Sequence, residues 1–137
     1  MWWMYALLSA LFAALTAVLA KIGIKGIDSN LATAVRTVVI VGLAWGIVYF
    51  RGGLVELHTL TTTNLVFLGL SGVATGLSWI FYFKALQLGK VSQVAPVDKL
   101  SVALAIVLSV VFLGEKLTLQ AGIGAGLIII GTLVLIL

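Results

Sequence analysis

Long apolar stretches, separated by short polar turns, are the feature that most constrains this chain. Five of them, each of about 20 residues and so long enough to cross the hydrocarbon core of a bilayer as a helix, cover the residues 2–20, 31–50, 65–83, 93–113 and 117–137. Hydrophobic residues make up 63% of the chain and charged residues 9%, whereas a soluble domain is about half apolar and a quarter charged. We therefore predict an all-α membrane protein with five transmembrane helices in one domain, 1–137, whose surroundings are the lipid bilayer.

The composition also argues against several classes of function. The net charge is +4, but the Lys and Arg residues are dispersed along the chain and form no basic patch for nucleic acid. The chain has no cysteine and a single histidine. With no metal-ligand cluster, no histidine beside a carboxylate and no nucleophile motif, we predict that the protein is not an enzyme and uses neither a cofactor nor a metal.

The distribution of basic residues predicts an orientation. An odd number of spans places the two termini on opposite sides of the membrane. The loops on the C-terminal side hold Lys21, Lys25, Lys84 and Lys90, whereas the opposite loops hold Arg51 and Lys116. Because loops rich in Lys and Arg stay in the cytoplasm, the C-terminus is predicted to be cytoplasmic and the N-terminus external. The bias is small, so insertion in both orientations is also compatible with it.

Polar and aromatic side chains recur at helical spacing inside the apolar spans, and we interpret them as a substrate pathway. Ser9 and Thr16 mark the first span, and Thr75, Trp79 and Tyr82 mark the third. The alternative is interhelical hydrogen bonding, which is worth about 0.6 kcal/mol for each bond in a membrane. The coincidence of these hydroxyls with aromatic and charged residues favours a lined cavity.

Asp98 and Lys99 lie near the start of the fourth span, and Arg36 lies at a similar depth in the second. Since neighbouring residues point apart on a helix, Asp98 and Lys99 are not expected to pair with each other. We predict instead an ion pair between Arg36 and Asp98, which leaves Lys99 to meet a substrate, and we predict that Pro96 is a structural hinge. In the alternative interpretation, Pro96 lies in the first helical turn, Asp98 complements the helix dipole and Lys99 snorkels to the headgroups.

Glycines spaced four residues apart let helix backbones approach closely in membranes. The last span has no polar stripe of its own and contains Gly122, Gly126 and Gly131. We predict that these glycines lie at or near the contact between two copies of the chain.

The segment FYFKALQLGKVSQVAPVDKLSVALAIVLSVVFLGEKLT, residues 81–118, resembles the signature of EamA-type proteins of the drug/metabolite transporter superfamily. Arg36 early in span two, Ala95-Pro96, and Gly114-Glu115 after span four agree with that pattern, and the similarity extends over the whole chain. Most members of the family resemble two fused, inverted copies of a five-helix unit. The resemblance therefore implies that this chain is one half of a ten-helix transporter and forms a homodimer.

The function implied is that of a transporter in the cytoplasmic (inner) membrane of a bacterium or archaeon, which exports small polar metabolites by alternating access. The first span lacks the acidic residue that the related small multidrug resistance proteins use, so an anionic or zwitterionic metabolite is favoured over proton-coupled export of cationic drugs. An antiparallel dimer supplies an inverted second unit and is favoured over a parallel one. A non-transporting membrane subunit, or a lipid-handling (flippase) partner, is the alternative function.

Overall fold

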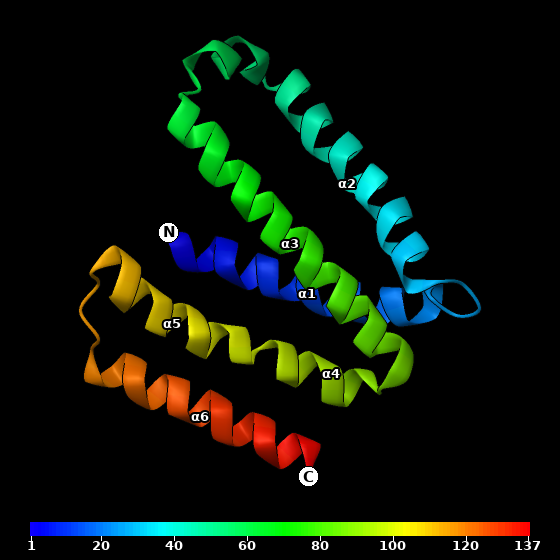
Figure 1. Cartoon of the computed structure of the whole chain (residues 1–137), viewed down its shortest axis with the longest axis vertical. Coiled ribbons are helices and arrows are strands. Elements are labelled where there is room, and N and C mark those ends of the chain that lie inside the picture. The colour runs from blue at the N-terminus through cyan, green and yellow to red at the C-terminus, as the bar shows by residue number, and fades with distance from the viewer. The chain divides into compact units, whose positions relative to one another are not determined.

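The computed structural model describes all residues from Met1 to Leu137 and is built from helices alone (Figure 1). It contains six α-helices and one short 3-10 helix: α1 (Trp2–Gly23), α2 (Ser29–Phe50), η1 (Gly53–Thr59), α3 (Thr62–Leu88), α4 (Val91–Asp98), α5 (Leu100–Leu113) and α6 (Leu119–Ile136). Five helical segments are long and apolar enough to cross a membrane when α4 and α5 are taken together as Val91–Leu113. The predicted all-α fold with five membrane spans is confirmed.

Short polar and glycine-containing turns determine where these helices begin and end. Asp28 precedes α2 with extended backbone angles, and its carboxylate accepts hydrogen bonds from the backbone N–H groups of Asn30 and Leu31 at 2.9 and 3.1 Å. This bonding satisfies two of the donors that a helix start leaves open, as the Asp-Ser-Asn sequence predicts. Gly52 and Gly114 end α2 and α5 with φ angles of 73° and 65°, a left-handed conformation that glycine adopts without steric cost.

Helix α3 is longer than the span expected from hydropathy. The apolar run predicts a helix over 65–83, but α3 continues to Leu88. The added residues include Ala85, Leu86 and Gln87, which are all good helix formers, and the helix stops just before Gly89. Hydropathy marks the residues that lipid can surround, whereas helix propensity determines how far the backbone hydrogen bonding continues. The helix is therefore longer than the apolar run.

The helices form two compact units, one of residues 1–18 and 88–137 and one of residues 19–87. In the first unit, α6 packs along α5 and against α4. In the second, α2 and α3 are the arms of a hairpin that η1 connects (Figure 1), with η1 packed against the end of α2.

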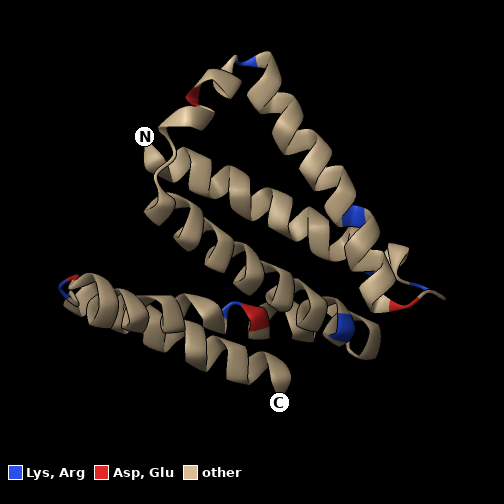
Figure 2. Ribbon diagram, turned by 45° about the horizontal axis from the view of Figure 1, so that its top comes forward, with Lys and Arg blue, Asp and Glu red and all other residues tan.

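Most of the apolar side chains lie on the outside of the helices. The buried apolar residues are Ala17, Ile24, Phe83, Leu86 and Ala103. Figure 2 shows charged residues mostly at turns and helix ends, with long uncharged stretches of helix between them. A helix that is apolar all round needs lipid or another protein chain as its neighbour, so the exposed surface of this fold is suited to a bilayer.

Candidate functional site

A positive charge inside the α2–α3 hairpin is the first element of the candidate site. Arg36 lies seven residues after the start of α2, which is about 10 Å along the helix at 1.5 Å per residue. Its guanidinium carbon is 4.5 Å from the ring centroid of Trp79 and 4.7 Å from that of Phe83. Both rings belong to α3 and are one helical turn apart, so one face of α3 supports the guanidinium at two points.

These contacts stabilise the charge without neutralising it. A cation over an aromatic face gains about 0.5–1 kcal/mol at an exposed site and about 2 kcal/mol or more when desolvated. The ion pair that the structure forms lies elsewhere, between Lys99 and Asp98. Neither Asp28 nor Glu56, the carboxylates of this unit, is paired with Arg36. A guanidinium held in this way presents a planar set of N–H donors to a carboxylate or phosphate.

The structure brings together part of the predicted pathway on α3. Trp79 meets Arg36, as its place on the polar stripe suggests, and Tyr82 packs edge-on against Phe83 with ring centroids 5.9 Å apart. Thr75 donates its hydroxyl proton to the carbonyl of Ser71 at 2.9 Å, so its donor is used within its own helix. Phe83, which is 1% exposed, is absent from the sequence prediction, although its position four residues after Trp79 places it on the same face.

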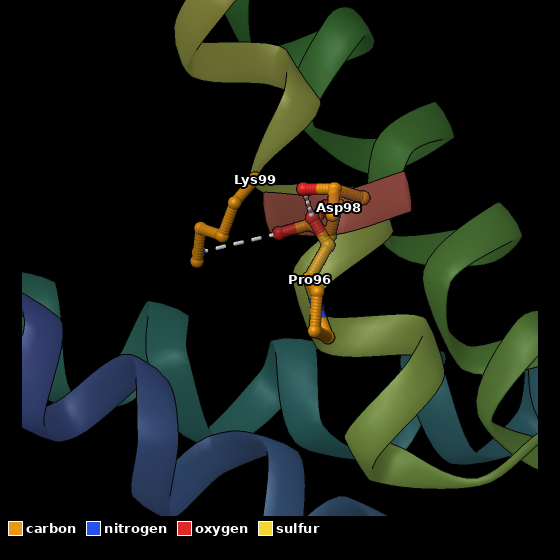
Figure 3. A network of polar contacts seen from close by, with 4 residues as sticks. Pro96, Asp98 and Lys99 are labelled. Atoms are coloured by element: carbon orange, nitrogen blue, oxygen red, sulfur yellow. Dashed lines mark hydrogen bonds and ion pairs between the residues drawn. The ribbon is translucent and has the colours of Figure 1, made fainter. Parts of the chain in front are cut away.

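A second charged element lies where the fourth span is interrupted. Helix α4 ends at Asp98, α5 begins at Leu100, and the Lys99 ammonium lies 3.3 Å from an Asp98 carboxylate oxygen (Figure 3). The expectation that these two neighbours do not pair is therefore wrong. It assumes an unbroken helix, whereas the chain turns at Lys99, which has φ −70° and ψ −10°, and the flexible lysine side chain reaches back to the carboxylate.

Pro96 explains the interruption. It is inside α4, as the sixth residue of a helix that starts at Val91, so the alternative that places it in the first turn is also wrong. A proline at this depth removes the hydrogen bond to the carbonyl of Ser92 and its ring crowds that carbonyl, which bends or breaks the helix. The backbone N–H of Lys99 is shared between the Ala95 carbonyl at 3.3 Å and the Pro96 carbonyl at 3.0 Å, so the shorter bond is that of a 3-10 turn.

Thr132 of α6 completes this arrangement. Its hydroxyl donates to the same Pro96 carbonyl at 3.2 Å, and the side chain is 4% exposed. Water does not reach the backbone groups that a helix break frees within lipid. Ser and Thr side chains of neighbouring helices can bond to such groups in place of water. The sequence prediction missed Thr132 because it is a lone hydroxyl in an apolar span, one turn or more from any other polar residue.

Two predicted residues lie on α1. Ser9 is exposed on that helix, and Thr16 donates its hydroxyl proton to the carbonyl of Phe12 at 2.8 Å. Their place in a pathway stays a prediction. The same holds for the ion pair between Arg36 and Asp98, since these residues belong to different units of the fold.

Comparison with known proteins decides the family. The EamA-like transporter family matches the chain over residues 1–137. The chain belongs to this family. A relative from Sinorhizobium sp., named "Uncharacterized transporter in cobO 3'region", is 48% identical over 134 residues, which cover 98% of this chain and 95% of the relative. No solved structure matches.

Membership of a transporter family bears on how the two charged elements are interpreted. The EamA-like chain is a multi-pass membrane transporter, and both the family and the name of the relative point to transport rather than to enzymatic chemistry. Transporters build their sites from polar groups within the spans and from interrupted helices. The aromatic-supported Arg36 and the α4–α5 break with its Asp98–Lys99 pair are two such features.

We predict that Thr132→Val loosens the break, because the valine has nearly the same shape but removes one donor to the Pro96 carbonyl and leaves only the Lys99 N–H. Hydrogen exchange at the amides of Lys99 to Val102 should become faster. The free energy of unfolding in micelles should fall by about 0.6 kcal/mol, the average for an interhelical hydrogen bond in a membrane protein. Thr132→Ser should restore both. The control is Thr16→Val, whose hydroxyl bonds only within α1. Equal exchange in Thr132→Val and the natural protein would contradict this role.

Proposed function

We propose that this EamA-like protein exports small anionic or zwitterionic metabolites across the cytoplasmic membrane of a bacterium or archaeon, by alternating access. The observation that carries the proposal is the Arg36 guanidinium, held against Trp79 and Phe83 inside a membrane span. A charged side chain at mid-bilayer costs about 2.5–3.5 kcal/mol on insertion scales. Such a residue is expected to have a function, and a permanent cation serves best as the receptor of an anionic group.

The charged pair at the broken fourth span is proposed to contact the solute at its own step of transport. In this proposal the Asp98–Lys99 pair opens when a zwitterion binds, so that the carboxylate of the substrate replaces Asp98 beside Lys99 and its ammonium takes the place of Lys99 beside Asp98. The pair is 35–55% exposed in its side chains, so this exchange does not require unpacking. The hydroxyls of Ser9, Thr16 and Thr75, together with the ring of Tyr82, are proposed to line the rest of the pathway.

Alternating access requires a segment that bends, and we assign that role to the α4–α5 junction. Pro96 removes one backbone hydrogen bond there, and Lys99 has the dihedral angles of a turn. Bending at a point where the helical bonding is already interrupted costs less than bending a continuous helix. The hinge lies next to the charged pair, so movement of the helix changes the accessibility of Lys99.

The partner that completes the pathway is proposed to be a second copy of the chain. A Cβ atom built on Gly122, Gly126 or Gly131 meets no atom within 4 Å, so the packing of this chain does not require glycine at these positions. Gly122 and Gly126 are one turn apart on α6, while Gly131 lies about 140° around the axis from Gly126. The dimer contact is therefore centred on Gly122 and Gly126, with Gly131 at its edge.

The two copies are proposed to be antiparallel. Binding sites of many transporters lie between two inverted repeats, and a single five-span unit obtains an inverted repeat only from a copy inserted the other way. The preferred orientation, with the C-terminus in the cytoplasm, follows from four lysines against two basic residues in the loops. A difference of this size is small enough for both orientations to occur.

Reconstitution in liposomes tests the transport proposal. We expect the purified protein to move labelled carboxylates or amino acids faster than empty vesicles leak them. Arg36→Gln should lower the rate by at least about tenfold, because a hydrogen bond to a charged group is worth about 1.5–3 kcal/mol. Arg51→Gln, in the turn after α2, is the matched control and should keep the natural rate. No flux above that of empty vesicles across a broad panel would favour the non-transporting subunit.

A double-mutant cycle tests the ion pair of Arg36 with Asp98 that the sequence predicts. Arg36→Gln, Asp98→Asn and their combination are compared by unfolding in micelles. If the two charges interact, the effect of the double variant should differ from the sum of the single effects by at least about 0.5 kcal/mol. Additive effects would show that Asp98 is served by Lys99 alone.

Labelling of single cysteines tests the antiparallel arrangement, which is practical because the natural chain has no cysteine. In the antiparallel dimer, an external impermeant maleimide should label about half of the Leu137→Cys molecules and about half of the Lys116→Cys molecules. In a parallel dimer, one position is labelled fully and the other is protected. Full protection of Leu137→Cys would require the antiparallel dimer to be abandoned.

A further inference from the structure

A basic pocket lies where the turn between α1 and α2 meets the end of α3, and it is separate from the candidate site. Its volume is about 330 Å³, which is within the range of about 300–1,000 Å³ for small-molecule sites. The residues that line it are Lys21, Ile24, Lys25, Gly26, Ile27 and Gln87. All of them belong to the same compact unit, residues 19–87.

Two long-range hydrogen bonds hold the walls of this pocket in place. The Gln87 side-chain amide donates to the carbonyl of Ile27 at 2.7 Å, and the Lys21 ammonium donates to the carbonyl of Leu86. Gly26 turns the chain between them with a φ of 76°. Lys21 before the turn and Gln87 of α3 therefore bond the turn to the end of α3, and these bonds fix the shape of the pocket.

The charge of the pocket is positive. Lys21 and Lys25 line it and no acidic residue does. The bond from Lys21 to the Leu86 carbonyl orients its ammonium. The nearest carboxylate in the sequence, Asp28, is used to cap α2. Ile27, which is exposed, adds apolar surface beside the two lysines.

We propose that this pocket binds a phosphate group at the membrane surface, in the form of an anionic lipid headgroup. The turn connects two membrane spans, so it lies at headgroup depth in either orientation of the chain. Basic pockets between spans are suited to phosphate headgroups because each Lys near the surface adds to the attraction, and the exposed side chain of Ile27 contacts the first acyl carbons. Bound lipid would tie α1, α2 and α3 together at one end.

Native mass spectrometry of the full chain released from micelles tests the site. We expect phosphatidylglycerol to bind more tightly than phosphatidylcholine with the same acyl chains. Lys25→Gln should weaken phosphatidylglycerol binding about fivefold, the loss expected for one lysine at the surface, while keeping both hydrogen bonds of the walls. Lys116→Gln, which removes one charge from the opposite loop, is the matched control and should bind like the natural protein.

A second arm identifies the source of the phosphate. Failure of millimolar inorganic phosphate to displace phosphatidylglycerol supports a lipid headgroup, whereas displacement that disappears in Lys25→Gln supports a phosphate site filled from solution. Equal binding of the two lipids, or equal losses in Lys25→Gln and Lys116→Gln, would overturn the proposal. These outcomes are independent of transport, because binding is measured without a gradient or a transported solute.

Discussion

The need to satisfy every backbone hydrogen bond without water is the constraint on which this structure depends. In a bilayer an open N–H or C=O costs several kcal/mol, so spans are helical and interruptions need a substitute partner. Four of the five spans meet this requirement as continuous helices. The fourth is interrupted at Lys99, shortly after Pro96, which has no N–H to give to the Ser92 carbonyl. The Pro96 carbonyl at this interruption accepts from the Lys99 N–H and from the hydroxyl of Thr132 in α6. A neighbouring helix thus contributes a hydroxyl donor at the interruption.

The three charges of the candidate site are accommodated in two physical ways. Asp98 and Lys99 compensate each other at the break, where the turn lets adjacent side chains meet at 3.3 Å. Arg36 instead lies against two aromatic rings, which stabilise a cation but leave its charge available. In the function we propose this difference matters, since a compensated pair has to exchange partners to bind a solute, whereas an aromatic-supported guanidinium can accept an anion directly.

The candidate site was predictable where helical spacing alone brings residues to one face. Trp79 follows from the polar stripe on the third span, and Phe83 follows from the same rule when it is extended by one turn. Thr132 did not follow, because only the packing of α6 against α4 gives a lone threonine a partner. The expectation that Asp98 and Lys99 do not pair was wrong, since the spacing rule holds for a regular helix and this helix is interrupted at Lys99.

The sequence by itself determined the membrane setting, the five spans, the capping by Asp28 and the family, because hydropathy, capping chemistry and family signature are local properties of the chain. The tertiary structure alone decided which carbonyl Thr132 satisfies, which rings support Arg36, and that Lys21 and Gln87 fasten the α1–α2 turn to α3. These are contacts between residues 36 to 65 positions apart in the chain. Their partners depend on how helices pack in space, and in spans that are apolar on every side the pattern of residues does not specify that packing.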